Sequence, residues 1–223
     1  MRSLICKMSA GGDITLRGGG GSVGTLTPGN LTIDTGSNTI TLGAALTVPG
    51  NLTITSGTLD TTASGCTGAS CAVSVTGNWS NLGTFNGRAG TVTLNGGDQS
   101  ISGNTTFYKL TKSSTTAATL TFAAGSTQII SNTLTLNGVA SNLLSLRSSS
   151  PGSSWSINPQ GTRVLSYLDV QDSNNTNATA IDVMTQNCMN SGRNTNWLFE
   201  ITSNARGLLL NGRMNLTGGL HLR

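Results

Sequence analysis

Pro28-Gly-Asn-Leu-Thr-Ile33 recurs further along the chain as Pro49-Gly-Asn-Leu-Thr-Ile54, an offset of 21 positions. Between the two copies, short strand-like triplets begin at every seventh position. They are Thr25-Leu-Thr27, Thr32-Ile-Asp34, Thr39-Ile-Thr41, Leu46-Thr-Val48 and Thr53-Ile-Thr55. Because successive side chains of a strand point to opposite faces, each triplet predicts one short strand. Three such strands in each repeat predict one coil of a three-sided parallel β-helix.

The repeat loosens after the first coils. Gly77-Asn-Trp79 follows Gly50-Asn-Leu52 at an offset of 27 positions, which predicts a loop insertion around residues 61–72. Three later triplets keep multiples of seven among themselves: Thr91-Val-Thr93, Thr119-Leu-Thr121 and Thr133-Leu-Thr135. At roughly 24 residues per coil, the chain has room for about seven to nine coils.

We therefore predict an all-β chain that forms a single parallel β-helix, or β-solenoid, with three strands per coil. Residues 1–22 are expected to be a Gly-rich lead-in or cap, 23–199 the repeat domain, and 200–223 a C-terminal cap, extra coil or extension. The alternative architecture is an antiparallel β-sandwich, which requires hairpin turns and alternation over about five or six residues. The shorter triplets and their regular spacing by sevens favour the β-helix.

The corners of the predicted coils carry Gly-Asn pairs. Asn30, Asn51 and Asn78 occupy equivalent corners, where residues that tolerate left-handed backbone conformations are typical. Stacked Asn side chains form hydrogen-bonded ladders in other β structures, so we expect a corner ladder here. Between the corners, inward Leu, Ile and Val predict an apolar core, and outward Thr suits a solvated sheet face.

Composition excludes several classes of protein. Gly, Thr, Ser and Asn make up about half of the 223 residues, whereas charged residues contribute 9% and aromatic residues 4%. So little charge excludes a coiled coil and a charge-driven disordered tail. No apolar run of about 18 residues occurs, so no membrane span is predicted. The net charge of +4 comes mainly from scattered Arg residues, and we expect no nucleic-acid partner.

The four cysteines suggest an oxidising compartment. Cys66 and Cys71 bracket four residues of a loop-like stretch, which favours a local disulfide over half of a metal site. Cys6 and Cys188 either pair with each other or stay free.

The later repeats resemble those of large secreted bacterial surface proteins, the adhesin-like and autotransporter-like parallel β-helix chains. The stretches that carry the resemblance are Thr76-Gly-Asn-Trp-Ser-Asn-Leu-Gly-Thr-Phe-Asn86, Gly90-Thr-Val-Thr-Leu-Asn-Gly96, Gln99-Ser-Ile-Ser-Gly103, Phe107-Tyr-Lys-Leu-Thr-Lys112, Val164-Leu-Ser-Tyr-Leu-Asp-Val-Gln-Asp-Ser-Asn174 and Asn190-Ser-Gly-Arg-Asn-Thr-Asn-Trp-Leu-Phe199. The resemblance implies a place outside the cell or on the bacterial surface, and it supplies no catalytic residues. The N-terminal stretch from Met1 to Met8 lacks the apolar run of a standard signal peptide, so we expect another export route or a longer parent chain.

Three carboxylates are candidates for enzymatic chemistry: Asp169, Asp172 and Asp182. Asp clusters act as acid and base in polygalacturonase-like enzymes, whereas pectate-lyase-like enzymes use carboxylate-bound Ca²⁺ and a basic residue, for which Arg163 is nearest. The oxygen-rich stretch from Asp172 to Asn177 is also a possible Ca²⁺ site, although no cofactor or metal is expected. The only His is His221, near the end of the chain, which gives no support for a nucleophilic triad.

The Thr-X-Thr triplets resemble those of ice-binding β-solenoids. The first three begin at Thr25, Thr39 and Thr53, two triplets apart each time. In a coil of three triplets this spacing places them on different sides, which argues against one ice-binding plane.

From these observations we expect a non-enzymatic structural or adhesive β-helix module of a bacterial surface or extracellular assembly. A carbohydrate-active enzyme and an ice-binding solenoid are the alternatives. The expected partners are a surface glycan or protein ligand and further copies of the chain, which would associate through exposed end coils. Residues 201–223 are apolar and strand-like in part, so we expect them to pack on the last coil or on another copy.

Overall fold

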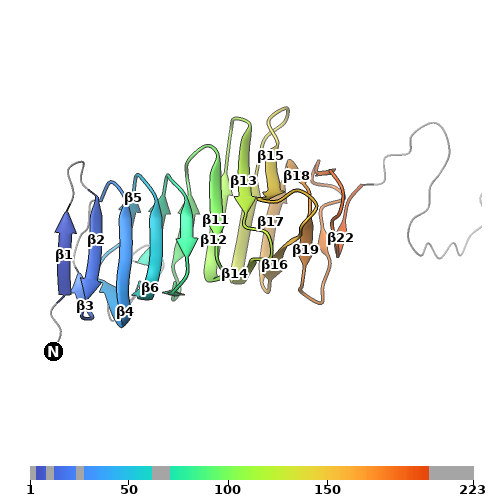
Figure 1. Cartoon of the computed structure of the whole chain (residues 1–223). Coiled ribbons are helices and arrows are strands. Elements are labelled where there is room, and N and C mark those ends of the chain that lie inside the picture. The colour runs from blue at the N-terminus through green and yellow to red at the C-terminus, as the bar shows by residue number, and fades with distance from the viewer. Residues whose placement is uncertain (1–3, 9–12, 24–27, 62–70, 201–223) are drawn as a thin grey trace, which may run out of the picture.

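The computed structural model describes residues 4–8, 13–23, 28–61 and 71–200, and these residues form an elongated all-β rod (Figure 1). Strands follow one another along the rod in sequence order, from β1 at one end to β22 at the other (Figure 1). This arrangement confirms the predicted parallel β-helix.

The first sheet forms one side of the helix over its full length. Along its path lie β1 (Leu4–Met8), β2 (Ile14–Gly18), β4 (Leu31–Leu42), β6 (Leu52–Asp60), β8 (Trp79–Asn81), β11 (Gln99–Ser102), β13 (Ala118–Phe122), β15 (Leu144–Ser148), β18 (Leu168–Val170) and β21 (Met189–Asn190). Off this path, β3 (Gly21–Val23) pairs with β4 and β9 (Thr84–Asn86) pairs with β6.

The second sheet supplies most of the other two sides. It contains β5 (Leu46–Val48), β7 (Val73–Val75), β10 (Thr91–Leu94), β12 (Thr105–Ser113), β14 (Thr127–Asn137), β16 (Trp155–Pro159), β17 (Thr162–Ser166) and β19 (Ser173–Asn175). A third sheet of two strands, β20 (Ile181–Asp182) and β22 (Trp197–Leu198), lies near the C-terminal end of the rod (Figure 1).

The register of the strands reproduces the sequence repeat. Leu31 pairs with Leu52, its counterpart in the second copy of the repeat, and Leu52 pairs with Trp79 of the longer third copy. Each coil has three sides, because long strands such as β4 and β12 bend through a corner and cover two of them. After β1, nine parallel strands follow one another along the first sheet, so the described residues make nine coils.

The N-terminal end is built differently from the rest. β1 pairs antiparallel with β2, with Leu4 opposite Gly18 and Met8 opposite Ile14. Parallel pairing then begins between β2 and β4, with Ile14 opposite Leu31. The coils therefore start inside the segment 1–22 that we expected to be a lead-in, and β1 covers the outer edge of the first coil. Residues 62–70, most of the predicted insertion, and 201–223 lie outside the described residues.

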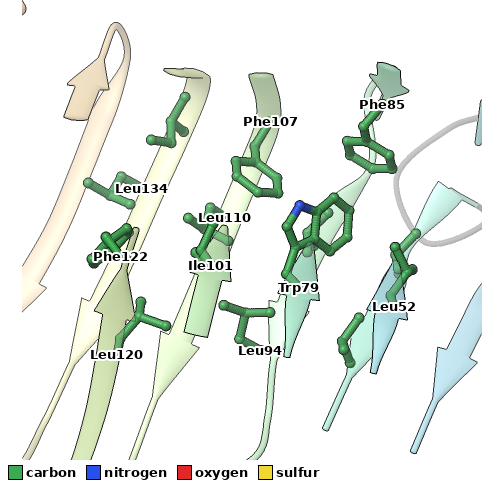
Figure 2. Close-up of a cluster of buried hydrophobic side chains, with 14 of the residues drawn as sticks. Leu52, Trp79, Phe85, Leu94, Ile101, Phe107, Leu110, Leu120, Phe122 and Leu134 are labelled. Carbon is green, nitrogen blue, oxygen red and sulfur yellow. The ribbon is translucent and has the colours of Figure 1, made fainter. Parts of the chain in front are cut away.

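The core consists of inward side chains that stack from coil to coil. One column on the first sheet runs through Ile14, Leu31, Leu52, Trp79, Ile101 and Phe122, all at most 5% exposed. Trp79, Phe85 and Phe107 form an aromatic cluster in mid-rod, with ring centroids 4.8 to 6.1 Å apart (Figure 2). Further along, the rings of Phe122 and Trp155 stack at 3.8 Å. All three Trp residues are thus part of the core and not surface platforms.

Candidate functional site

A ladder of side-chain oxygens joins successive coils at one corner. The Oδ1 atoms of Asp13, Asn30, Asn51 and Asn78 accept hydrogen bonds from the backbone N–H groups of Asn30, Asn51, Asn78 and Ser100 respectively, each at 2.7 Å. The structure thus places Asn30, Asn51 and Asn78 at equivalent corners. Each oxygen binds the backbone of the next coil, which satisfies a donor at a point where the sheet ladder is interrupted.

The glycines of the same corner are required for close approach and not for a left-handed conformation. A Cβ atom on Gly50 would lie 2.3 Å from Oδ1 of Asn30, and one on Gly77 would lie 2.6 Å from Oδ1 of Asn51. Neither glycine has a positive φ angle. Our expectation of a left-handed conformation was therefore wrong at these two glycines. Glycine is needed there because the neighbouring coil fills the space that a side chain would occupy.

Among the residues that the structure describes, four ion pairs also connect adjacent coils. The Arg17–Asp34 pair is separated by 3.5 Å and the Arg88–Asp60 pair by 2.5 Å, and two closer pairs follow near the C-terminal end. These are Arg147–Asp169 and Arg193–Asp172. Each pair joins one coil to the next, so both the corner ladder and the charged groups brace the rod along its axis.

The structure places each of the three candidate carboxylates in its own hydrogen-bonding environment. Asp169, on β18, accepts hydrogen bonds from Arg147 and from Oγ of Ser191. Asp172 is 1% exposed, and its hydrogen bond from Arg193, together with one from the Gly152 amide, lowers its pKa.

Asp182 lies on β20, in a different sheet from Asp169, and is exposed. Its Oδ1 accepts the Met184 N–H at 3.0 Å. Among the described residues, no hydrogen bond joins any two of the three carboxyl groups. The guanidinium of Arg163 donates to the carbonyls of Ala180, Pro159 and Thr179, and burial lowers its pKa.

The predicted Ca²⁺ stretch is also engaged in internal hydrogen bonds. The Asn175 amide donates to the carbonyls of Thr179 and Asn196, and Oδ1 of Asn177 accepts the Thr179 N–H. Over the part of the chain that the structure describes, no group of three or more His, Cys, Asp or Glu side chains could hold a metal ion.

Cys71 is disulfide-bonded, and its predicted partner Cys66 lies outside the described residues. Cys188 is a free thiol, half-buried, whose pKa is raised by burial. The side chain of Cys6 and the whole of His221 also lie outside the described part.

The Thr-X-Thr triplets fall on all three sides of the rod. Thr53–Thr55 and Thr119–Thr121 lie on the first sheet, whereas Thr91–Thr93 and Thr133–Thr135 lie on the second. Thr39–Thr41 occupies the second half of β4, on another side, and residues 25–27 are outside the described part. The register also gathers hydroxyl groups from several coils into one outward column of the second sheet, which contains Thr47, Ser74, Thr93, Thr111 and Thr135.

One buried lysine, Lys112, is not among the residues that the sequence singles out. Lys112 is fully buried in a core column, between Leu94 and Leu136 of the adjacent coils. Its Nζ donates to the carbonyls of Gly96 and Gly97 and to Oε1 of Gln99, at 2.7 to 3.0 Å. Burial lowers the pKa of this amine to about 8, although Asp98 opposes the shift.

The alternation along β12 contains the signal that would have revealed this lysine. Leu110 points inward, so Lys112, two residues later in the same strand, must point inward too. Gly96 and Gly97 lie in the turn between β10 and β11, and Gln99 begins β11, so their approach to Lys112 could not be predicted from sequence spacing alone.

The fold and the coil-to-coil bracing define the class of the protein as a parallel β-solenoid. The described residues contain no helix long and apolar enough to cross a membrane. Comparison of the sequence with known protein families, curated proteins and solved structures finds no match.

Proposed function

We propose that this chain is a non-enzymatic structural or adhesive β-helix module of a bacterial surface or extracellular assembly. The observation that carries the proposal is the axial bracing of the rod. The corner ladder and all four ion pairs of the described residues join neighbouring coils. These polar and charged side chains thus hold neighbouring coils together.

A braced stack of this kind is suited to a mechanical role. With strands about 4.8 Å apart, nine coils give a rod of roughly 40 Å. Every coil packs on its neighbours, so the length of the rod is set by the number of coils. The rod can therefore hold a binding surface at a fixed distance from its point of attachment. Its outward positions are mostly Thr and Ser, which keep a long sheet surface soluble with little charge.

Two further observations support a location outside the cell. Cys71 forms a disulfide, and disulfides persist in oxidising compartments. The repeats also resemble those of adhesin-like and autotransporter-like surface proteins, most clearly between Thr76 and Lys112. The resemblance supports the proposed class and assigns no ligand.

Force spectroscopy tests the mechanical role. The chain is tethered at its two ends and stretched, and we expect it to lose one or a few coils at a time, with extension steps of roughly 24 residues at about 3.5 Å each. Arg147→Met, which removes one brace, should lower the force of the corresponding step. A rod that opens in one event, with no change in Arg147→Met, would contradict the proposal.

A cleavage assay tests the enzymatic alternative. The chain is incubated with polygalacturonate, with and without Ca²⁺, and new reducing ends and unsaturated products are measured. We expect no cleavage above the rate of the double variant Asp169→Asn/Asp182→Asn. Cleavage by the wild type that this variant lacks would establish the enzyme and replace the structural proposal.

A further inference from the structure

A hollow of about 260 Å³ opens at a corner of the rod, between the fourth and sixth coils. We call it the corner pocket. It is lined mainly by Phe85, Asn86, Arg88, Thr106, Tyr108 and Ser131. Asn86 ends β9, Thr106 and Tyr108 belong to β12, and Ser131 belongs to β14, so three successive coils contribute to one pocket.

The pocket forms where successive coils turn the corner with different numbers of residues. In the fourth coil β9 ends at Asn86 and β10 begins at Thr91, so four residues turn the corner. In the next two coils β12 and β14 continue through the same corner, with an irregular register beside Tyr108. The turn of the fourth coil has Arg88 in a left-handed conformation, with φ 47°. A non-glycine residue in this region is uncommon and is held there by its surroundings.

Arg88 forms the polar wall of the pocket and Tyr108 forms the aromatic wall, and each side chain is held by a contact outside the pocket. Arg88 donates two hydrogen bonds to the nearly buried carboxylate of Asp60, which compensates its charge. Nζ of Lys109 lies 5.7 Å from the centroid of the Tyr108 ring, a cation–π distance that restrains the ring. The walls are therefore preorganised, which reduces the entropy lost on binding.

The floor of the pocket belongs to the core. Phe85 is 5% exposed, and its ring packs at 4.8 Å from that of Trp79 and at 6.1 Å from that of Phe107 (Figure 2). Ser131 and Thr106 stand at the rim with exposed hydroxyl groups.

This combination matches the chemistry of a sugar ring. A pyranose has an apolar C–H face that packs on an aromatic ring and a rim of hydroxyl groups that exchange hydrogen bonds with amide, hydroxyl and guanidinium groups. The volume is below the about 300–1,000 Å³ of sites for drug-sized ligands, which suits one monosaccharide unit. Because Arg88 is already paired with Asp60, an uncharged sugar fits the pocket better than a uronate.

We propose that the corner pocket binds one uncharged hexose or N-acetylhexosamine unit of a glycan, with Tyr108 as the stacking platform. The inference rests on the proposed adhesive function, because it names the class of ligand that the rod would hold. Asn86, Ser131 and Thr106 supply the hydrogen-bonding groups that orient the sugar.

Saturation-transfer NMR and calorimetry on the full chain test this site with four probes: cellohexaose, mannohexaose, β-1,4-galactohexaose and chitohexaose. We expect at least one probe to bind. Tyr108→Ala should weaken that binding by about tenfold or more, because the stacking surface is lost, whereas Tyr108→Phe should retain it.

A second variant keeps the test valid if Tyr108→Ala fails to fold. Ser131→Trp places a large side chain in the pocket from an exposed position and should abolish binding. Its matched control is Thr162→Trp, at an exposed position of β17 outside the pocket, which should bind like the wild type. Circular dichroism melting confirms that each variant is folded.

The outcomes separate the two proposals. If none of the four probes binds to the folded wild type, or if Ser131→Trp binds as well as Thr162→Trp, the corner pocket is not a glycan site, and the structural role is unaffected. If a bound hexaose is cleaved, the non-enzymatic function is refuted while the pocket remains a sugar site. Binding without cleavage that Ser131→Trp abolishes supports the inference.

Discussion

Lys112 shows how one residue can make the stability of this rod depend on pH. Its pKa is about 8 in the folded chain, against 10.5 for an ordinary lysine. Between these two pH values the unfolded chain binds a proton that the folded chain does not. The free energy of unfolding therefore rises as the pH increases from about 8 to 10.5, by up to about 3 kcal/mol from this group.

We expect urea unfolding to detect this effect. From pH 7.5 to pH 10, the free energy of unfolding of the wild type should rise relative to that of Lys112→Met by about 2–3 kcal/mol. Met is apolar and of similar length, so it fits between Leu94 and Leu136 without a charge. Parallel pH profiles for the two proteins would show that the buried amine does not titrate in this range.

Gly50 gives a second prediction at the scale of a residue. Gly50→Ala places a Cβ atom 2.3 Å from Oδ1 of Asn30 and 2.5 Å from the Gly29 carbonyl, so the corner must shift, at a cost of about 1–3 kcal/mol. The matched control is Gly97→Ala, where a Cβ atom meets nothing within 4 Å. Thermal melting should separate the two variants, and equal melting temperatures would argue against tight packing at this corner.

At the scale of the element, the corner ladder is the feature that distinguishes this stack from a plain set of parallel strands. Oδ1 of Asn51 accepts the Asn78 N–H at 2.7 Å, and Asn51 itself is exposed. Asn51→Ala leaves that N–H to water and should lower the free energy of unfolding by about 1 kcal/mol.

Asn51→Asp keeps an oxygen in the same place and tests whether the hydrogen bond is responsible. We expect it to retain most of the stability that Asn51→Ala loses, as measured by urea unfolding at neutral pH. Thr47→Ala, at an exposed outward position of β5, serves as the control for loss of a polar surface group. Equal losses in Asn51→Ala and Asn51→Asp would assign the effect to the amide group and not to the ladder.

The sequence predicted the elements best where the repeat is regular. The copies at residues 28–33 and 49–54 defined the coil, because an identical corner and strand must take identical places in a stack. The antiparallel β1 could not be predicted in this way, since it has no counterpart in the repeat.

The candidate sites were harder to predict than the strands. The ion pairs and the corner pocket depend on which residues of neighbouring coils face each other, and coil lengths vary between the corners. The step from Leu31 to Leu52 is shorter than the step from Leu52 to Trp79, although each joins one coil to the next. Partners such as Asp60 and Arg88 therefore cannot be paired by a fixed spacing.

At the scale of the whole molecule, the two ends of the rod differ in whether a further strand covers the last coil. At the N-terminal end β1 covers the edge of the first coil. At the other end, the last described strands, β21 and β22, each pair with only one neighbouring strand among the described residues, and Met189 and Leu198 occupy outward positions on them, 56% and 44% exposed. A strand with one unpaired edge is a site for the addition of another strand.

Deletion of residues 201–223, which lie outside the described part, tests what covers this end. We expect the chain 1–200 to melt at a lower temperature than the full chain and to associate, because no later segment could then cover the edges of β21 and β22. Light scattering and thermal melting of the two forms provide the measurement. If both are monodisperse monomers with equal melting temperatures, the tail neither caps the rod nor links it to another copy.

The corner ladder has a direction, and this has a consequence for biosynthesis. In each of its four bonds the oxygen belongs to the earlier coil and the N–H to the later one. A coil that has left the ribosome or an export channel therefore already presents the acceptor that the following coil needs. Each finished turn acts as a template for the one still emerging, and vectorial folding can keep pace with delivery of the chain.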